Sequence, residues 1–255
     1  MKEKLFFKNS KENDLCGILS NPTGDCVRPI IILCHGFSSR KEGRTYAHLE
    51  EILNKKGIST FRFDFFGHGE SEGRFEDITT SEAVDDVMNS IAFLQKLRYT
   101  KMGLMGSSFG GMASILAASQ SNEINVLTLK SPVSDYRSMT LTRRSDSEIQ
   151  DWKEKGVIEF EGVNNEKQRL GYEFFKDAKK INAYQAAQNI TVPTLIVHGG
   201  ADKTVPVEQS WKAARFIQKC RLEIIPGCDH TYSHPEHFDQ LLNLISRFII
   251  ENLQS

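Results

Sequence analysis

The chain has 255 residues, which is enough for one large domain with a sizeable buried core. Its 32 Lys and Arg residues balance 33 Asp and Glu residues, which argues against a nucleic-acid-binding stripe or an acidic tail. No apolar stretch is long enough to span a bilayer and no apolar signal region begins the chain, so we expect a cytoplasmic protein without membrane insertion.

The first hundred residues predict an antiparallel pair of strands followed by alternating strands and helices. The expected elements are strands at 4–8, 15–20, 29–34 and 59–64, with helices at about 45–56 and 81–97. The continuous apolar run at 29–34 is typical of a strand buried on both faces of a parallel sheet. The Gly-rich loop at 64–73 lacks the spacing of a dinucleotide-binding site, so we interpret it as structural.

The best-defined motif is Gly-x-Ser-x-Gly, at residues 106–110. An apolar run leads into it from residue 101, and a helix-like segment follows at 112–119. Strand, tight turn and helix form the setting of a nucleophile elbow, in which a strained turn lifts the Ser hydroxyl clear of the backbone. The flanking residues must be small because strand and helix approach closely there. Ser108 is therefore the candidate nucleophile, and a chance occurrence of the motif is the alternative.

After a strand at 124–129, residues 134–188 interrupt the alternation of strands and helices with polar, charged and aromatic residues. This stretch is longer than an ordinary connection, so we expect an inserted lid over the site, with a surface excursion as the alternative. The alternation then resumes with a strand at 192–199, a helix at 207–219, a strand at 221–225 and a helix at 235–253. The core is expected to comprise residues 1–133 and 189–255.

Loops at the carboxyl ends of three expected strands offer one reactive side chain each: Ser108, Asp202 and His230. A Ser hydroxyl is a poor nucleophile until a base such as neutral His accepts its proton. An Asp would hold the imidazole in the required tautomer and stabilise the imidazolium. The backbone N–H groups of Phe37 and Phe109 are the candidate donors of an oxyanion hole.

Other histidines compete with His230 for the role of base. His234 and His237 follow it at spacings of four and three residues, which on one helix would resemble a metal face. Pro235 argues against a helix through all three, and the His-Glu-x-x-His pattern is absent from the sequence, so no metal is expected. His230 is favoured because it follows the last strand at once.

Two other carboxylates compete with Asp202 for the role of the acid. Asp135 follows the end of the preceding strand, and Asp229 is adjacent to the candidate base. The side chain of Asp229 should diverge from the imidazole of its neighbour. Asp202 is favoured because it lies in the loop before, in the context Asp-x-x-Val-Pro.

These motifs together resemble the α/β-hydrolase superfamily over essentially the whole chain. The matching pieces are His35-Gly-Phe37, Asp64-Phe-Phe-Gly-His-Gly-Glu-Ser71, Gly106-Ser-Ser-Phe-Gly110, His198-Gly-Gly-Ala-Asp202 with Val205-Pro206, and Asp229-His230. Within the superfamily the sequence looks like small bacterial cinnamoyl or feruloyl esterases and monoacylglycerol-lipase-like, serine aminopeptidase-type members. The resemblance implies an α/β fold with an eight-stranded, mostly parallel sheet, helices on both faces and a small lid.

The expected function is a serine carboxylesterase that hydrolyses small to medium acyl or aryl esters, such as cinnamoyl esters. A thioesterase, a lysophospholipase or monoacylglycerol lipase, and an aminopeptidase remain alternatives, as does a non-catalytic binding module. His35, Trp152 and Phe160 are the candidate substrate contacts. No cofactor is expected, the five cysteines receive no chemical role, and a homodimer remains open.

Overall fold

Eight strands form one mixed sheet in the computed structural model, which describes residues 1–25, 29–162 and 167–254. In spatial order these strands are β1 (Lys2–Lys8), β2 (Asp14–Ser20), β4 (Ser59–Phe63), β3 (Ile30–Cys34), β5 (Met102–Ser107), β6 (Ile124–Lys130), β9 (Thr194–Gly199) and β10 (Cys220–Ile225). β2 pairs antiparallel with β1 and β4, and the other neighbours are parallel. The expected eight-stranded, mostly parallel sheet is confirmed.

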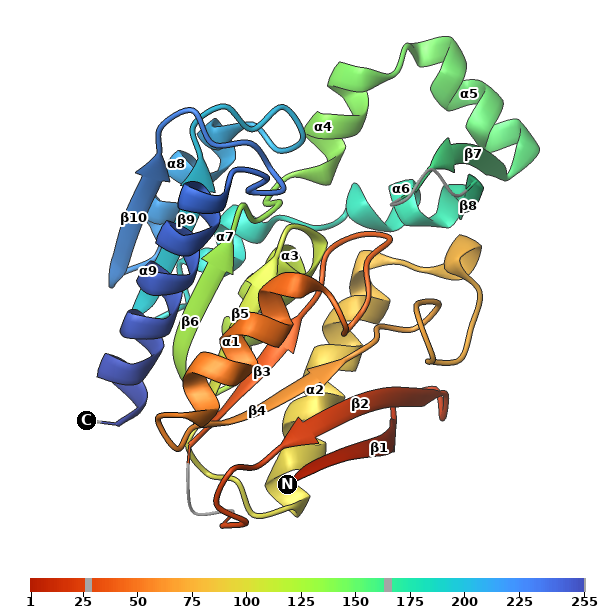
Figure 1. Ribbon diagram of the computed structural model, residues 1–255. Coiled ribbons are helices and arrows are strands. Elements are labelled where there is room, and N and C mark those ends of the chain that lie inside the picture. The colour runs from red at the N-terminus through yellow and green to blue at the C-terminus, as the bar shows by residue number, and fades with distance from the viewer. Residues whose placement is uncertain (26–28, 163–166, 255) are drawn as a thin grey trace.

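Helices cover both faces of this sheet (Figure 1). One face carries α1 (Arg44–Asn54) and α9 (Pro235–Leu253), and the other carries α2 (Thr80–Lys96), α3 (Phe109–Ala118), α7 (Ala183–Ala187) and α8 (Val207–Phe216). The helix expected at 207–219 ends earlier, because Ile217 is extended and starts the connection to β10. None of the described helices is both long and apolar enough to cross a membrane.

Two apolar layers on either side of the sheet make up the core. β3 is buried at all of its residues, as its unbroken apolar run predicts. Alternate side chains point to opposite faces, so Ile32 packs with the layer under α2 and α3, whereas Ile31 and Leu33 pack with α1 and α9. The central strands are thereby fixed in register, and their carboxyl ends form a stable edge for the site.

Between β6 and α7 the chain leaves the sheet and runs above the carboxyl ends of the strands (Figure 1). This segment contains α4 (Tyr136–Arg143), α5 (Asp146–Lys155), the hairpin of β7 (Val157–Glu161) and β8 (Lys167–Gly171), and α6 (Tyr172–Ala178). Asp135 caps α4, and Ser145 with Glu148 forms a capping box at the start of α5. The sequence predicts an insertion here but not its elements.

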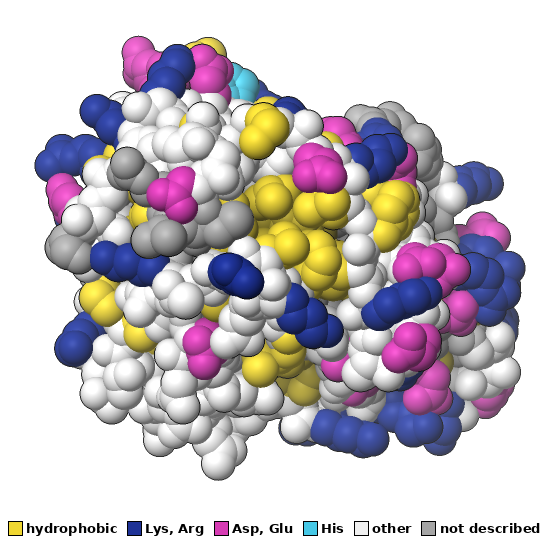
Figure 2. Space-filling view, turned by 90° about the horizontal axis from the view of Figure 1, so that it is seen from below, with side chains coloured by type: hydrophobic (Ala, Val, Ile, Leu, Met, Phe, Trp, Pro, Cys, Tyr) yellow, Lys and Arg dark blue, Asp and Glu magenta, His cyan; other side chains and the backbone are white. Residues whose placement is uncertain are grey.

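The face opposite to the insertion carries hydrophobic side chains that gather near its centre (Figure 2). A groove of about 450 Å³ in the N-terminal part of the fold includes Phe6 and Leu19 of β1 and β2, and Phe93 of α2. Phe6 is 56% exposed on an edge strand. The edge also carries lysines, which discourage pairing with another strand.

Candidate active site

Ser108 lies at a sharp turn between β5 and α3. Its backbone has φ 53° and ψ −110°, a strained conformation for a residue other than Gly. The glycines on either side are required by close backbone approach: a Cβ on Gly106 would lie 2.4 Å from the carbonyl oxygen of Gly110. A Cβ on Gly110 would in turn lie 2.4 Å from the carbonyl oxygen of His35. The motif therefore adopts the geometry that the spacing of its glycines predicts.

The structure brings the three expected side chains together in one chain of hydrogen bonds. The distance from His230 Nε2 to Ser108 Oγ is 3.2 Å, and His230 Nδ1 lies 2.6 Å from Asp202 Oδ2. A carboxylate only accepts hydrogen bonds, so Nδ1 carries a proton and Nε2 of the neutral ring accepts the Ser hydroxyl proton. The Asp202 side chain is fully buried, whereas that of His230 is 17% exposed.

Asp202 is held as a carboxylate by its surroundings. Its Oδ1 accepts hydrogen bonds of 2.8 Å from the backbone N–H groups of Thr204 and Val205. Burial alone would raise its pKa, but contacts with His198 and His230 outweigh burial and hold the pKa well below the usual range. Asp202 therefore presents a negative charge to His230 throughout the neutral pH range.

The residues that compete with Asp202 and His230 for the roles of acid and base contact other groups. Asp135 accepts a hydrogen bond from the Ser138 N–H at the start of α4. Asp229 binds Thr231 and Ser233 within its own turn, so its side chain diverges from the imidazole as expected. Among the additional histidines, His234 is the exposed residue just before α9, and its ring lies 5.2 Å from that of His237.

The expected oxyanion donors lie on the loop after β3 and at the first residue of α3. Within the described ranges, the backbone N–H groups of Phe37 and Phe109 have no hydrogen-bond acceptor. The Gly110 N–H donates 3.1 Å to the carbonyl oxygen of His35, which ties the elbow to the loop that carries Phe37. This hydrogen bond therefore holds together the two backbone segments that carry the free N–H groups.

The side chain of His35 lies differently from its expected position as a substrate contact. It is fully buried; Nδ1 lies 2.8 Å from the Gly36 carbonyl oxygen, and Nε2 accepts from the Phe65 N–H at 3.1 Å. Burial lowers its pKa to about 4, so the ring is neutral. A ring with both nitrogens engaged in this way has no surface for a substrate, and it instead fixes the backbone before Phe37.

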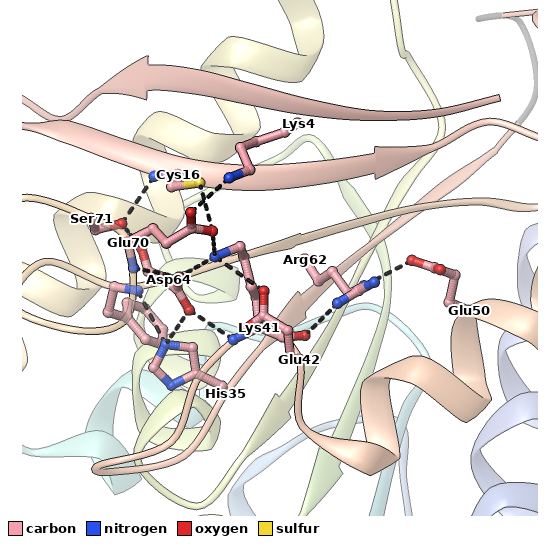
Figure 3. Close-up of polar contacts among 11 residues, drawn as sticks. Lys4, Cys16, His35, Lys41, Glu42, Glu50, Arg62, Asp64, Glu70 and Ser71 are labelled. Carbon is pink, nitrogen blue, oxygen red and sulfur yellow. Dashed lines mark hydrogen bonds and ion pairs between the residues drawn. The ribbon is translucent and has the colours of Figure 1, made fainter.

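A buried lysine that no sequence pattern indicates holds the same loop in place (Figure 3). Lys41 Nζ lies 2.5 Å from Asp64 Oδ2 and 2.7 Å from Glu70 Oε2, and its own N–H donates to Asp64 Oδ1 at 2.7 Å. The Lys41 side chain is only 1% exposed. The loop after β3 is thereby joined to the loop after β4, and the surrounding carboxylates raise the pKa of the lysine against the effect of burial.

A second missed lysine supports the loop that carries His230. Lys130 ends β6, donates 3.2 Å from Nζ to the His230 carbonyl oxygen, and lies 4.7 Å above the ring of Tyr232. Burial lowers its pKa to about 8. Nothing in the sequence marks Lys130 as buried, because a lysine at a strand end is usually exposed.

An apolar pocket of about 350 Å³ opens beside Ser108 under the insertion. Trp152 and Phe160 line it, as expected, together with Phe37, Val133, Tyr136, Met139, Ile158, Leu170, Phe174 and Val205. The Trp152 Nε1–H donates to the Leu170 carbonyl oxygen at 3.0 Å, which fixes the indole. Arg143 and Arg144 add the only charges among the described lining residues. The pocket therefore suits an apolar group and offers no carboxylate to an amine.

A group of carboxylates on α2 lies outside this site. Glu82, Asp85 and Asp86 come close enough together to hold a cation, but Asn9 and Lys11 bind two of these groups. The Asn9 amide donates to both Glu82 and Asp86 at 3.0 Å. The cluster therefore has protein partners and joins the β1–β2 turn to α2.

Comparison with known proteins identifies the family of the chain. The model of the prolyl oligopeptidase family matches residues 45–255. The chain belongs to the prolyl oligopeptidase family. Its relatives include named esterases and thioesterases, and the chain has an α/β-hydrolase fold.

Three relatives of this prolyl oligopeptidase family member are informative. The chain is 29% identical over 233 residues to "Putative esterase/lipase 2" of Mycoplasma pneumoniae, and the match covers 81% of this chain and 85% of that protein. It is 26% identical over 204 residues to the mitochondrial palmitoyl-protein thioesterase ABHD10 of Mus musculus, covering 77% of this chain and 66% of that protein. It spans only 35% of the length of another curated relative.

A solved structure of Est1E from Butyrivibrio proteoclasticus with bound ferulic acid is similar over 98% of this chain and 100% of that one. The TM-score is 0.85 and the sequence identity is 27%. The similarity thus includes the insertion as well as the sheet of this prolyl oligopeptidase family member.

Proposed function

We propose that this chain is a serine carboxylesterase that hydrolyses esters of small to medium acyl or aryl acids, cinnamoyl-like acids included. The observation that carries the proposal is the continuous path from Asp202 through His230 to Ser108, which ends beside an apolar pocket. The ferulic acid bound to Est1E supports an aryl acid as one occupant of such a pocket.

In the proposed first step, Ser108 Oγ attacks the ester carbonyl carbon while His230 Nε2 takes the hydroxyl proton. The negative charge on the carbonyl oxygen is stabilised by the backbone N–H groups of Phe37 and Phe109. When the tetrahedral intermediate collapses, the carbon–oxygen bond to the alcohol breaks and the imidazolium returns its proton to the departing alkoxide. An acyl-enzyme on Ser108 remains.

In the second step, His230 takes a proton from water, and the resulting hydroxide attacks the acyl-enzyme carbonyl carbon. The bond to Ser108 Oγ then breaks, the serine recovers its proton from the imidazolium, and the carboxylic acid leaves. Asp202 keeps the imidazole oriented and stabilises its charged form in both steps. The segment from α4 to α6 acts as a lid that shapes the acyl pocket.

A thioesterase is the second candidate, because ABHD10 is named as a palmitoyl-protein thioesterase. The same steps apply to a thioester, with a thiolate as the leaving group. An aminopeptidase is less well supported, since the described lining of the pocket contains no carboxylate that could bind a substrate ammonium group.

The proposal is tested with fluorogenic esters of graded acyl length and of aryl acids, measured for the wild type and for Ser108→Ala. We expect turnover by the wild type, with a preference for one range of acyl size, and a loss of at least about 1,000-fold in Ser108→Ala. Ser107→Ala is the matched control, because Ser107 is adjacent but lies within β5. Turnover that survives in Ser108→Ala, or its absence in the wild type, would contradict the proposal.

A further inference from the structure

A second pocket, of about 560 Å³, lies beside the first and has a different character. Its walls are the loop after β3, the loop after β4 and the hairpin of the insertion, and its lining includes Ser38, Ser39, Arg40, His68, Phe75 and Gln168. Arg40 and Glu42 contribute one charge of each sign, so the described lining is neutral overall. We call this space the polar pocket.

Two of the lining side chains hold buried hydrogen-bond acceptors that lack donors. His68 is 4% exposed; its Nδ1 lies 3.0 Å from the Phe66 carbonyl oxygen, so Nδ1 carries the proton and Nε2 is an acceptor. Neither His68 Nε2 nor Gln168 Oε1 has a hydrogen-bond partner within the described part of the chain. Buried acceptors are costly to leave unsatisfied, and both side chains line the polar pocket, so a small shift of either one would let it accept from an N–H or O–H donor of a ligand.

Two walls of the polar pocket are braced by ionic contacts and tight turns. Buried Lys41 clamps the loop after β3 to Asp64 and Glu70 on the loop after β4, and these two loops are the walls of the pocket (Figure 3). Gly67 and Gly69 have φ values of 72° and 50°, so the second wall is a tight turn of bare backbone. A pocket that is shaped before binding loses little entropy when it orders a ligand.

The position of the polar pocket relates it to the proposed reaction. Phe37 lines the apolar pocket beside Ser108, whereas Ser38, the next residue, lines the polar pocket. The ring of Phe37 lies 5.1 Å from that of Phe75, which belongs to the polar pocket. The loop that carries Phe37 and Ser38 therefore lies between the apolar pocket and the polar pocket.

We propose that the polar pocket binds the leaving group of the substrate and selects leaving groups that carry O–H or N–H donors near the scissile bond. This inference rests on the proposed function and adds the chemistry of the second half of the substrate. Two kinds of leaving group carry such donors. One is a polyhydroxy alcohol released from an oxygen ester, and the other is an amide-bearing thiol released from a thioester. The neutral lining favours both over a phosphate or a carboxylate.

Two matched pairs of substrates with one common acyl group test the proposal. The ethyl ester is compared with the glycerol monoester, and the ethanethiol ester with the N-acetylcysteamine ester. Within each pair, the second member adds donors, and the ratio of the two kcat/KM values reports their recognition. We expect at least one pair to show a ratio of about fivefold or more in favour of the donor-bearing substrate. The pair that responds identifies the source of the donors.

Variants at Gln168 test whether the polar pocket causes the ratio of the two kcat/KM values. Gln168→Met removes the acceptor at similar size, and we expect the ratio to fall toward one. Gln168→Glu keeps an acceptor oxygen and should retain a preference. Gln185→Met makes the same change on the exposed face of α7, outside both pockets, and should leave the ratio at its wild-type value.

A ratio near one for both wild-type pairs would overturn the proposal, and so would a ratio that Gln168→Met leaves unchanged. These results differ from a failure of the proposed function, in which the wild type would hydrolyse none of the four substrates. Hydrolysis without a preference removes only the leaving-group inference. Absence of hydrolysis removes both.

Discussion

At the scale of single residues, the site depends on a carboxylate that is buried yet remains charged. Asp202 has four hydrogen-bonding neighbours: the backbone N–H groups at 204 and 205, and the side chains of His198 and His230. These contacts offset the cost of burying a charge. Its proposed role is therefore electrostatic and orienting rather than that of a proton acceptor.

Replacing Asp202 by Asn removes this charge while keeping the size of the side chain. We expect kcat toward the best ester to fall by about 10⁴-fold, because the wrong imidazole tautomer would face Ser108. Asp135→Asn is the control, since Asn caps a helix as well as Asp does at the start of α4. Circular dichroism would show that both variants are folded, and a loss below tenfold in Asp202→Asn would contradict the assigned role.

The glycine contacts at the elbow allow a second residue-scale prediction. The Cβ of Gly110→Ala would lie 2.4 Å and 2.5 Å from the carbonyl oxygens of His35 and Cys34, so the backbone must move. We expect a loss of about 1–3 kcal/mol in the free energy of unfolding, as for other overpacked sites, together with reduced kcat.

Gly36→Ala is a suitable comparison for Gly110→Ala, because its Cβ would meet the nearest atoms at 3.5 Å, an ordinary contact. Urea unfolding of both variants measures the difference. Equal stability of the two variants would show that the elbow tolerates the displacement.

At the scale of elements, two loops and two strands are joined by one buried cation. Lys41 comes from the loop after β3, and its partners Asp64 and Glu70 come from the loop after β4. Arg62 of β4 adds a hydrogen bond of 2.9 Å to the Lys41 carbonyl oxygen and an ion pair with Glu50 of α1. These ionic contacts position the loop that carries Phe37, in addition to the apolar packing of the Phe37 ring.

Lys41→Met removes the cation and leaves the fully buried Asp64 carboxylate without its counter-charge. We expect the free energy of unfolding to fall by about 3–5 kcal/mol, the usual cost of breaking a buried ion pair from one side. Lys55→Met breaks an exposed pair with Glu51 and should cost less than about 1 kcal/mol. Chemical denaturation compares the two, and similar losses in both variants would contradict the proposed importance of burial.

The sequence predicts the core and the three reactive residues for a common physical reason. Strands buried on both faces are continuous apolar runs, as at 30–34, and parallel strands end at one edge, so the loops after β5, β9 and β10 meet there. Burial of charged residues is not encoded locally. The partners of Lys41 and Lys130 come from loops distant in the sequence, so only the folded chain shows them.

The insertion is predicted as a segment but not as elements. β8 reads Lys-Gln-Arg-Leu-Gly, in which Leu170 alone is buried, so no alternating pattern marks it as a strand. β8 pairs antiparallel with β7 and contacts residues 75–77, which lie far away in the sequence. The orientation of His35 was also beyond the sequence, because a loop histidine beside a site can face either the substrate or the backbone.

At the scale of the whole molecule, pH couples the site to folding through Lys130. Its pKa in the folded protein is about 8, below the ordinary value of 10.5, because burial disfavours its charge. Asp202 and Asp229 oppose this effect, and Arg44 adds to it. Between pH 8 and 10.5 the unfolded chain binds more protons than the folded one at this residue, so this residue makes the protein more stable as pH rises.

We therefore expect the stability difference between the wild type and Lys130→Met to depend on pH. From pH 7 to pH 10 the free energy of unfolding of the wild type should rise by roughly 2.5 kcal/mol relative to that of the variant, because this range covers most of the shift in pKa. Urea unfolding at several pH values measures this gain. Lys176→Met, at an exposed lysine, should show no such trend, and parallel curves for Lys130→Met would contradict the prediction.

The direct pairing of β6 with β9 has a consequence for how such an enzyme diversifies. Leu127 lies in register with Thr194, so the chain that forms the apolar pocket leaves and rejoins the sheet at neighbouring strands. An excursion of this kind can be lengthened, shortened or exchanged between homologues without altering the register of any central strand. New substrate preferences are therefore accessible by recombination at two adjacent points, while the chemistry beneath them is inherited unchanged.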